Sequence, residues 1–137
     1  MRAISKILIL GIAVMIFVFI MTGCSKKGTN KSNQTSYEQI SAEEAKKIMD
    51  TESDYIIIDT RTQEEFDEGH IQGAVLIPEY EIKERAEEVL KDKQQLILVY
   101  CRSGRRSKLA SQALADLGYT NVKEFGGIID WKYGLVQ

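Results

Sequence analysis

The sequence predicts an α/β fold built around a mostly parallel sheet. Two observations predict this class: short apolar runs rich in β-branched residues recur along the chain, and segments with helical spacing of apolar residues separate them. Strands that alternate with amphipathic helices are typical of parallel sheets covered by helices. With 137 residues, 44% of them hydrophobic, the chain has room for one such domain and its core.

The strands are expected at residues 55–60, 74–78, 95–100 and 121–125. The first three, "YIIIDT", "AVLIP" and "QLILVY", are nearly continuous apolar runs, so we expect each of them to be buried on both faces of the sheet. The fourth, "NVKEF", carries charge and is expected to be a short strand near the end of the chain.

The helices are expected at residues 41–50, 62–69, 79–92 and 105–118. The first two begin with capping-box spacing, in which a Ser or Thr is followed three residues later by Glu. The third is acidic, and its charged residues are expected to face solvent. In the fourth, helical spacing predicts one buried face, made of Leu109, Ala113, Leu114 and Leu117.

The first residues have the layout of a secretory signal. The uncharged run Ile7–Met21 follows the basic residues Arg2 and Lys6, as an apolar h-region follows a charged n-region. The run ends in "MTGC", which resembles the lipobox of bacterial lipoproteins, although that motif usually has Leu where this chain has Met21. We therefore expect residues 1–23 to be a lipoprotein signal peptide and Cys24 to carry the lipid.

The alternative is an uncleaved membrane-spanning anchor, but the apolar run is shorter than the roughly 20 residues that a spanning helix needs. The polar stretch "SKKGTNKSNQTS" follows Cys24, so residues 24–36 are expected to be the lipidated cysteine and a flexible linker. The globular domain is expected at residues 37–137. In both cases the domain would be tethered to the cell membrane on its extracytoplasmic face.

The stretch "YCRSGRRS", residues 100–107, contains the strongest functional signal in the sequence. Cys101 directly follows a predicted strand, and ligand sites in open α/β sheets form beyond the carboxyl ends of the strands. The next helix begins only a few residues later, so the backbone N–H groups of the loop can point at one spot and bind an anion. Gly104 permits this tight curl because glycine tolerates a positive φ.

Positive charge gathers around this cysteine although the domain is acidic. Residues 36–137 contain 13 Lys and Arg against 20 Asp and Glu, a net charge of −7. A cationic environment lowers the pKa of a thiol and attracts anionic substrates, so Cys101 is the candidate nucleophile. The alternative is a buried, inert cysteine that only precedes a helix. The cations within eight residues of Cys101 are Arg102, Arg105, Arg106 and Lys108.

The cysteine and histidine counts exclude several kinds of site. If Cys24 carries lipid, Cys101 is the remaining thiol, and a disulfide framework within the chain is impossible. His70 is the single histidine, which leaves too few ligands for a His/Cys metal cluster, and we expect it to have a structural role. We expect no metal and no nucleic-acid partner.

Three motifs, in order along the chain, resemble those of the rhodanese sulfurtransferases. "YCRSGRRS" is similar to the family's active-site loop, and "IIIDTRTQEEFDEGHIQGAVLIP" (residues 56–78) is similar to its amino-terminal signature. "FGGIIDW" (residues 125–131) is similar to its carboxyl-terminal motif, with Trp131 expected in the core. The resemblance covers residues 36–137. It implies a single-domain, thiosulfate sulfurtransferase-like rhodanese with a five-stranded, mostly parallel sheet and helices on both faces.

The resemblance also implies a reaction in two half-steps. The Cys101 thiolate would take the sulfane sulfur of thiosulfate, or of a similar small anionic donor, and form a persulfide. A thiophilic acceptor, such as cyanide, a thiol or a protein, would then remove that sulfur. Asp59 and Arg61 would support the active-site loop, and no organic cofactor would be needed. The loop residues expected to bind the donor and the persulfide are Arg102, Ser103, Gly104, Arg105 and Arg106.

Two other classes of function stay open at this point. Phosphatases and arsenate reductases of related fold need a Cys-x5-Arg loop, whereas here Ser107 stands at that position and Arg106 at Cys-x4-Arg. The shorter loop suits a sulfur atom better than a tetrahedral oxyanion. The second class is a non-enzymatic sulfur carrier or protein-interaction module. The presence of Cys101 argues against a module without sulfur chemistry, but it does not separate a carrier from an enzyme.

Overall fold

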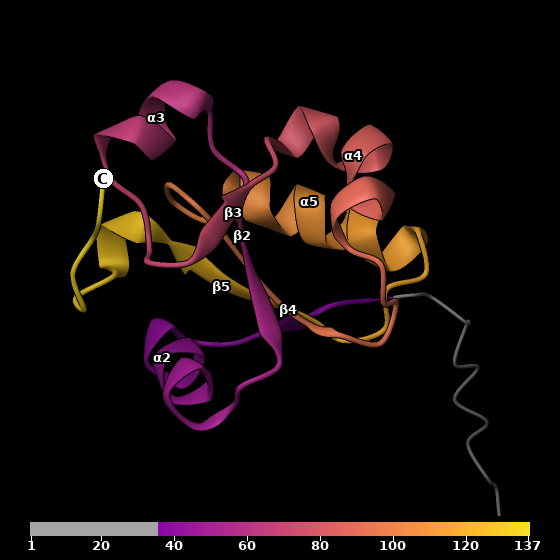
Figure 1. Cartoon of the computed structure of the whole chain (residues 1–137), viewed down its shortest axis with the longest axis horizontal. Coiled ribbons are helices and arrows are strands. Elements are labelled where there is room, and N and C mark those ends of the chain that lie inside the picture. The colour runs from indigo at the N-terminus through magenta and orange to yellow at the C-terminus, as the bar shows by residue number, and fades with distance from the viewer. Residues whose placement is uncertain (1–35) are drawn as a thin grey trace, which may run out of the picture. The chain divides into compact units, whose positions relative to one another are not determined.

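The computed structural model describes residues 36–137 and shows one five-stranded sheet in which all strands run parallel (Figure 1). The predicted fold class is therefore confirmed. The predicted signal peptide, Cys24 and nearly all of the predicted linker lie outside the described residues. The strand order is β1-β5-β4-β2-β3. The strands are β1 (Glu38–Gln39), β2 (Tyr55–Asp59), β3 (Ala74–Leu76), β4 (Leu96–Cys101) and β5 (Val122–Gly127).

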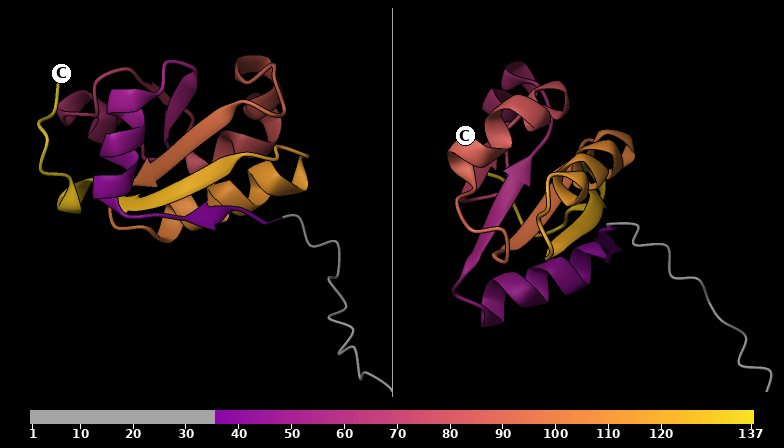
Figure 2. Two further views of the ribbon diagram at one scale, coloured as in Figure 1. Left: turned by 90° about the horizontal axis from the view of Figure 1, so that it is seen from below. Right: turned by 90° about the vertical axis from the view of Figure 1, so that its right-hand side faces the viewer.

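Helices cover both faces of this sheet (Figure 2). Helix α2 lies on one face, and α4 and α5 lie on the other. Within residues 36–137, no helix has the length and apolar character needed to cross a membrane. The helices are α2 (Ala42–Thr51), α3 (Gln63–Glu68), α4 (Ile82–Val89) and α5 (Arg105–Asp116), with short 3-10 turns η1 (Glu79–Glu81) and η2 (Ile128–Asp130).

Both predicted capping boxes are present. At the start of α2, the backbone N–H of Glu44 donates to Ser41 Oγ at 3.1 Å, and the N–H of Ser41 donates to the Glu44 carboxylate at 2.8 Å. At the start of α3, Thr62 and Glu65 make the same reciprocal pair at 3.3 and 3.0 Å. These bonds satisfy N–H groups that have no partner within the helix, which explains where both helices begin.

The central strand β4 divides its side chains between two cores. Ile97 and Val99 belong to the cluster under α4 and α5, whereas Leu98 and Tyr100 belong to the cluster on the α2 side. All four are fully buried. The sequence of a strand with both faces buried is a nearly continuous run of apolar residues. "QLILVY" was predicted to be such a strand, and this prediction is confirmed.

Two predictions about burial are wrong. The segment predicted as the second buried strand is β3, which lies at the edge of the sheet, and its central residue Val75 is 38% exposed. In α5, Leu109 was predicted on the buried face but is 50% exposed. The other predicted residues do face the core: Leu114 is fully buried, and Ala113 and Leu117 are partly buried against it. The buried face is displaced toward Ala110, because residues 109 and 110 both have helical spacing to the apolar residues that follow, and periodicity alone did not decide between them.

The strand β1 was not predicted from the residues themselves. It has two residues, Glu38 and Gln39, both exposed, and it pairs with β5 at the edge of the sheet. Because its side chains are polar, only backbone pairing identifies it as a strand. It completes the five-stranded sheet that the family resemblance implied.

Candidate active site

Cys101 is the last residue of β4, between β2 and β5 in the sheet, and its side chain is 1% exposed. The pairing of β4 with β5 shifts between Val99 and Cys101, so that Cys101 lies opposite Gly127. Such irregularities occur next to active sites because they change the direction in which a side chain points. The buried thiol therefore sits at the carboxyl edge of the sheet, where the sequence placed it.

The loop after Cys101 curls back over the sulfur atom. Gly104 has φ +97° and precedes the first turn of α5, and its backbone N–H donates a hydrogen bond to Cys101 Sγ at 3.0 Å. A side chain cannot replace glycine at position 127, because a Cβ there would lie 2.3 Å from the carbonyl oxygen of Arg102. The loop is thus packed backbone against backbone onto the end of β5.

Hydrogen bonds lower the pKa of the Cys101 thiol. Burial by itself raises this pKa, but the Ser107 hydroxyl and the backbone N–H groups of Ser107, Ser103 and Gly104 outweigh burial. The lowered pKa was predicted to come from the nearby arginines. The structure instead gives this role to the Ser107 hydroxyl and to N–H groups at the start of the helix, which lie closer to the sulfur than exposed guanidinium groups can.

The three arginines of the loop have different surroundings. Arg102 and Arg105 are exposed, and within residues 36–137 neither forms an ion pair. Arg106 binds Glu65 through two parallel hydrogen bonds of 2.7 and 2.8 Å, which joins α5 to α3. This contact lowers the pKa of Glu65 to about 2 and raises that of Arg106. The charge of Arg106 also acts on Cys101. Arg102 and Arg105 are therefore the loop arginines free to meet a donor.

On the β2 side of the loop, Asp59 and Arg61 form a buried ion pair. The guanidinium donates to both carboxylate oxygens at 2.7 and 3.0 Å and to the carbonyl oxygen of Gly69 at 2.7 Å. The two residues are 0% and 5% exposed. The guanidinium also lies 5.8 Å from the ring centre of Tyr100, the residue before the cysteine. The structure thus places Asp59 and Arg61 against the base of the loop.

On the β5 side, Ser107 and Glu124 form a contact that the sequence analysis did not single out. Glu124 is 2% exposed, and one of its oxygens accepts hydrogen bonds from the Ser107 hydroxyl at 2.6 Å and from the N–H of Gly126 at 2.8 Å. A single carboxylate within a predicted strand is the signal that could have revealed this contact, because charged side chains are rarely buried unless they are paired. In the sheet, Glu124 lies opposite the apolar residue Val99 of β4.

Other candidate features have structural roles or lie away from Cys101. The His70 ring stacks on Phe66 at 3.7 Å between ring centres, and its Nδ1 contacts the Phe66 carbonyl at 3.0 Å. In the part of the chain that the structure describes, no group of His, Cys, Asp and Glu side chains could hold a metal ion. Trp131, expected in the core, packs against Phe125 but stays partly exposed.

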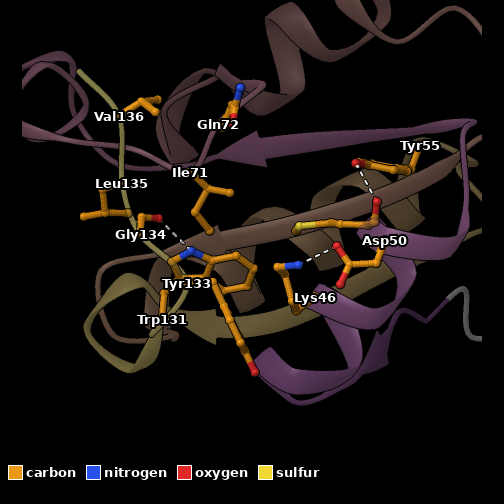
Figure 3. A pocket seen from close by; sticks show the side chains of 11 residues that line it. Lys46, Asp50, Tyr55, Ile71, Gln72, Trp131, Tyr133, Gly134, Leu135 and Val136 are labelled. Atoms are coloured by element: carbon orange, nitrogen blue, oxygen red, sulfur yellow. Dashed lines mark hydrogen bonds and ion pairs between the residues drawn. The ribbon is translucent and has the colours of Figure 1, made fainter.

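A hollow of about 430 Å³ lies between α2 and the carboxyl-terminal segment (Figure 3). Trp131, Tyr133 and Leu135 line it from the carboxyl-terminal segment, and Lys46 lines it from α2. No residue of the Cys101 loop lines it. This hollow is therefore separate from the Cys101 loop.

Known proteins resemble both the sequence and the fold. Residues 41–133 match the family described as Rhodanese-like domain. Thiosulfate sulfurtransferase PspE of Escherichia coli is 42% identical over 73 residues, which cover 53% of this chain and 70% of that protein. The putative sulfur carrier protein YrkF of Bacillus subtilis is 35% identical over 108 residues, 77% of this chain but only 57% of that protein. The solved structure of a "rhodanese with anions from E. coli" has a TM-score of 0.58 at 38% identity, over 61% of this chain and 98% of that one.

Proposed function

Because the chain belongs to the Rhodanese-like domain family, whose named relatives include sulfurtransferases, we propose that it transfers sulfane sulfur from thiosulfate through a persulfide on Cys101. The Cys101 thiolate attacks the outer sulfur of thiosulfate, the S–S bond of thiosulfate breaks, and sulfite leaves. Cyanide or a thiol then takes the outer sulfur of the persulfide, and Cys101 is released as thiolate. The sulfur donor can equally be another small anion with a sulfane sulfur.

One observation carries this proposal: a buried thiol whose pKa is lowered by a ring of backbone N–H groups and a hydroxyl. These donors stabilise a negative charge on sulfur in the thiolate, and they are positioned to do the same for the outer sulfur of a persulfide. The exposed Arg102 and Arg105 add positive charge at the mouth of the loop, which favours an anionic donor.

The alternative functions differ in what the loop must hold. A phosphatase or arsenate reductase requires a loop that surrounds a tetrahedral oxyanion, and the candidate arginine for that role, Arg106, is already bound to Glu65. A sulfur carrier would form the same persulfide but pass its sulfur to a protein, as the name of the Bacillus subtilis relative suggests for that protein. Carrier and enzyme therefore share the first half-reaction and differ in the acceptor.

The test is replacement of the nucleophile. We expect the protein to form thiocyanate from thiosulfate and cyanide, and we expect Cys101→Ala to lose this activity entirely, because no other thiol lies in the described domain. Intact-mass measurement after exposure to thiosulfate should show one added sulfur, about 32 Da, on the unchanged protein and none on the variant. Unchanged turnover in Cys101→Ala would exclude this mechanism.

We further propose that the domain is held at the extracytoplasmic face of the cell membrane by lipid on Cys24. The proposal is supported by the apolar run Ile7–Met21 and by "MTGC" at its end. Mass spectrometry of the membrane-extracted protein should find a lipid-modified amino-terminal peptide that begins at Cys24, and Cys24→Ala should remove the modification. An intact peptide containing Arg2 would indicate an uncleaved anchor instead.

A further inference from the structure

Another hollow, of about 390 Å³, opens on the surface between η1, α4 and α5, and it shares no lining residue with the hollow of Figure 3. Tyr80 lines it from η1, and Leu109 lines it from α5. These two side chains are 70% and 50% exposed. Single apolar side chains are ordinary on a protein surface, but here two large ones from different elements line the same hollow. The hollow is therefore a candidate contact surface.

The α5 wall of this hollow starts at the catalytic loop. The backbone N–H of Gly104 donates to Cys101 Sγ at 3.0 Å, and α5 begins with the next residue, Arg105. Leu109 follows Gly104 on the same helix, at a distance of about 7.5 Å along the helix axis. The apolar side chain in the hollow thus lies close to the nucleophile, at a separation that the helix fixes.

The η1 wall is held by the strand that carries the nucleophile. The backbone N–H of Glu79, the first residue of η1, donates to the carbonyl oxygen of Thr60 at 3.1 Å. The backbone N–H of Thr60 in turn donates to the carbonyl oxygen of Tyr100 at 3.0 Å, and its hydroxyl donates to the same oxygen at 2.9 Å. Tyr100 directly precedes Cys101, so both walls of the hollow are positioned by the chain segment that positions the sulfur.

The charge of this surface changes along α5. Arg105 lies one helical turn before Leu109 on the same face, next to Lys108, and both cations are exposed. Within residues 36–137, neither cation forms an ion pair. Near the other end of α5, Asp116 lines the hollow and accepts a hydrogen bond from Gln112 at 2.8 Å. The other charged residues that line the hollow, of opposite sign, are Glu79 and Lys83. The end nearest the catalytic loop is therefore the cationic one.

We propose that this hollow docks the sulfur acceptor, and that the acceptor is a protein segment with acidic residues beside its cysteine and an apolar side chain a few residues away. This inference rests on the proposed persulfide. The acceptor thiolate attacks the outer sulfur of the Cys101 persulfide, the S–S bond breaks, Cys101 leaves as a thiolate, and the acceptor becomes a persulfide. An extended chain rises about 3.3 Å per residue, so about two or three residues span the separation between the loop and Leu109.

The openness of the hollow favours a protein over a small acceptor. Sites for small molecules bury most of the surface of the ligand, whereas Tyr80 and Leu109 leave this hollow open to solvent. A protein segment covers both side chains and removes their apolar surface from water. Because the domain is acidic overall, the exposed cations beside the loop are the place where an acidic segment is attracted, and they orient it with its cysteine toward Cys101.

The test measures docking without any sulfur transfer. The probe is a short synthetic peptide whose single cysteine is activated as a mixed disulfide with thionitrobenzoate, with aspartates beside the cysteine and a leucine about three residues away. Two further peptides carry serine in place of the leucine or lysines in place of the aspartates. The Cys101 thiolate attacks the peptide sulfur, thionitrobenzoate leaves, and mass spectrometry follows the modified Cys101 peptide. The proteins are the full chain, Leu109→Gln, Tyr80→Ser and the matched control Leu135→Gln, which is also 50% exposed but lines the other hollow.

We expect the unchanged protein and Leu135→Gln to react at least about fivefold faster with the first peptide than with either substituted peptide. Leu109→Gln and Tyr80→Ser should lose the preference for leucine and keep the preference for aspartate. The persulfide form of the protein should transfer sulfur to the free-thiol peptides in the same order. Thiocyanate formation should be unchanged in Leu109→Gln, because cyanide needs no docking surface.

The docking proposal is overturned if the three peptides react at equal rates with the unchanged protein, or if Leu109→Gln and Tyr80→Ser both keep the preference for leucine. It is also overturned if sedimentation shows a dimer of the unchanged protein that Leu109→Gln abolishes, because a second copy of the chain then covers the hollow. The expected peptide preference in a protein that forms neither persulfide nor thiocyanate would count against the proposed function and still support the docking of a thiol partner.

Discussion

Two buried carboxylates flank the strand that ends in Cys101, and their partners differ. Asp59 on β2 lies opposite Tyr100, and Glu124 on β5 lies opposite Val99. They are 0% and 2% exposed. Asp59 is bound by the guanidinium of Arg61, whereas Glu124 is bound by the Ser107 hydroxyl and a backbone N–H.

This difference shows that the partner, not the burial, decides what a buried carboxylate can do. The Arg61 guanidinium supplies a full counter-charge to Asp59, and the pair acts as a fixed brace for the loop. The hydroxyl and the amide that bind Glu124 carry no net charge. We therefore expect the two flanks of the loop to respond differently to mutation, with the β2 flank contributing more to stability than the β5 flank.

The largest expected effect is on the β2 flank. Arg61→Ala leaves the Asp59 carboxylate buried without its counter-charge, which should lower the free energy of unfolding by about 3–5 kcal/mol. Glu124→Gln keeps a hydrogen-bond acceptor for Ser107 and should cost only about 1 kcal/mol. Urea unfolding of both variants checks this. If Glu124→Gln unfolds as easily as Arg61→Ala, the distinction between the two flanks is wrong.

An intermediate effect is expected from the ion pair that joins α3, which follows β2, to α5. The pKa of Glu65 is about 2 in the folded protein, below its ordinary value of 4.5, chiefly because Arg106 donates hydrogen bonds to it. A lowered pKa stabilises the fold fully above about pH 4.5 and loses this contribution as the pH falls toward 2. Between these values, the unchanged protein should lose about 1 kcal/mol more stability than Glu65→Gln.

Urea unfolding at several pH values between about 6 and 2 measures this difference. The control is Glu87→Gln, which removes a carboxylate of α4 that is paired with Lys93 and not with a residue of the loop. Parallel loss of stability in the unchanged protein and in Glu65→Gln over the acid range would show that the Arg106 contact does not anchor the loop. Arg106 would then be available to the sulfur donor, as the sequence analysis expected.

The smallest effect is expected at the mouth of the loop. Arg102→Gln and Arg105→Gln should each raise KM for thiosulfate by up to about fivefold with kcat nearly unchanged, because exposed charges contribute about 1 kcal/mol or less. Steady-state kinetics measures both constants, and the increase should shrink at high salt. Lys91→Gln, at an exposed position just after the end of α4, is the control. Unchanged KM in both arginine variants would mean that backbone N–H groups alone bind the donor.

The sequence was informative where a local pattern has a single structural solution. The capping boxes at Ser41 and Thr62, the buried strand ending in Cys101 and the glycine at position 104 were all predicted, because each depends on residues close together in the chain. Asp59 and Arg61 were named as site residues from a family motif. The pattern of apolar residues placed Leu114 correctly on the buried face of α5, but it placed Leu109 wrongly.

The sequence by itself determined the order of the four helices and of four of the five strands, the cysteine at a strand end and the turn that curls over it, because these follow from hydrophobic periodicity and backbone preference. Only the tertiary structure decided the partners of the charged groups. Ser107 and Glu124 are 17 residues apart, and Glu65 and Arg106 are 41 residues apart. Contacts over such distances depend on which strands are neighbours in the sheet, and the chain states this nowhere locally. The stretch "YCRSGRRS" therefore predicted the position of Cys101 at a strand end, whereas the groups that lower the pKa of its thiol, the Ser107 hydroxyl and the backbone N–H groups of the loop, became clear only in the folded structure.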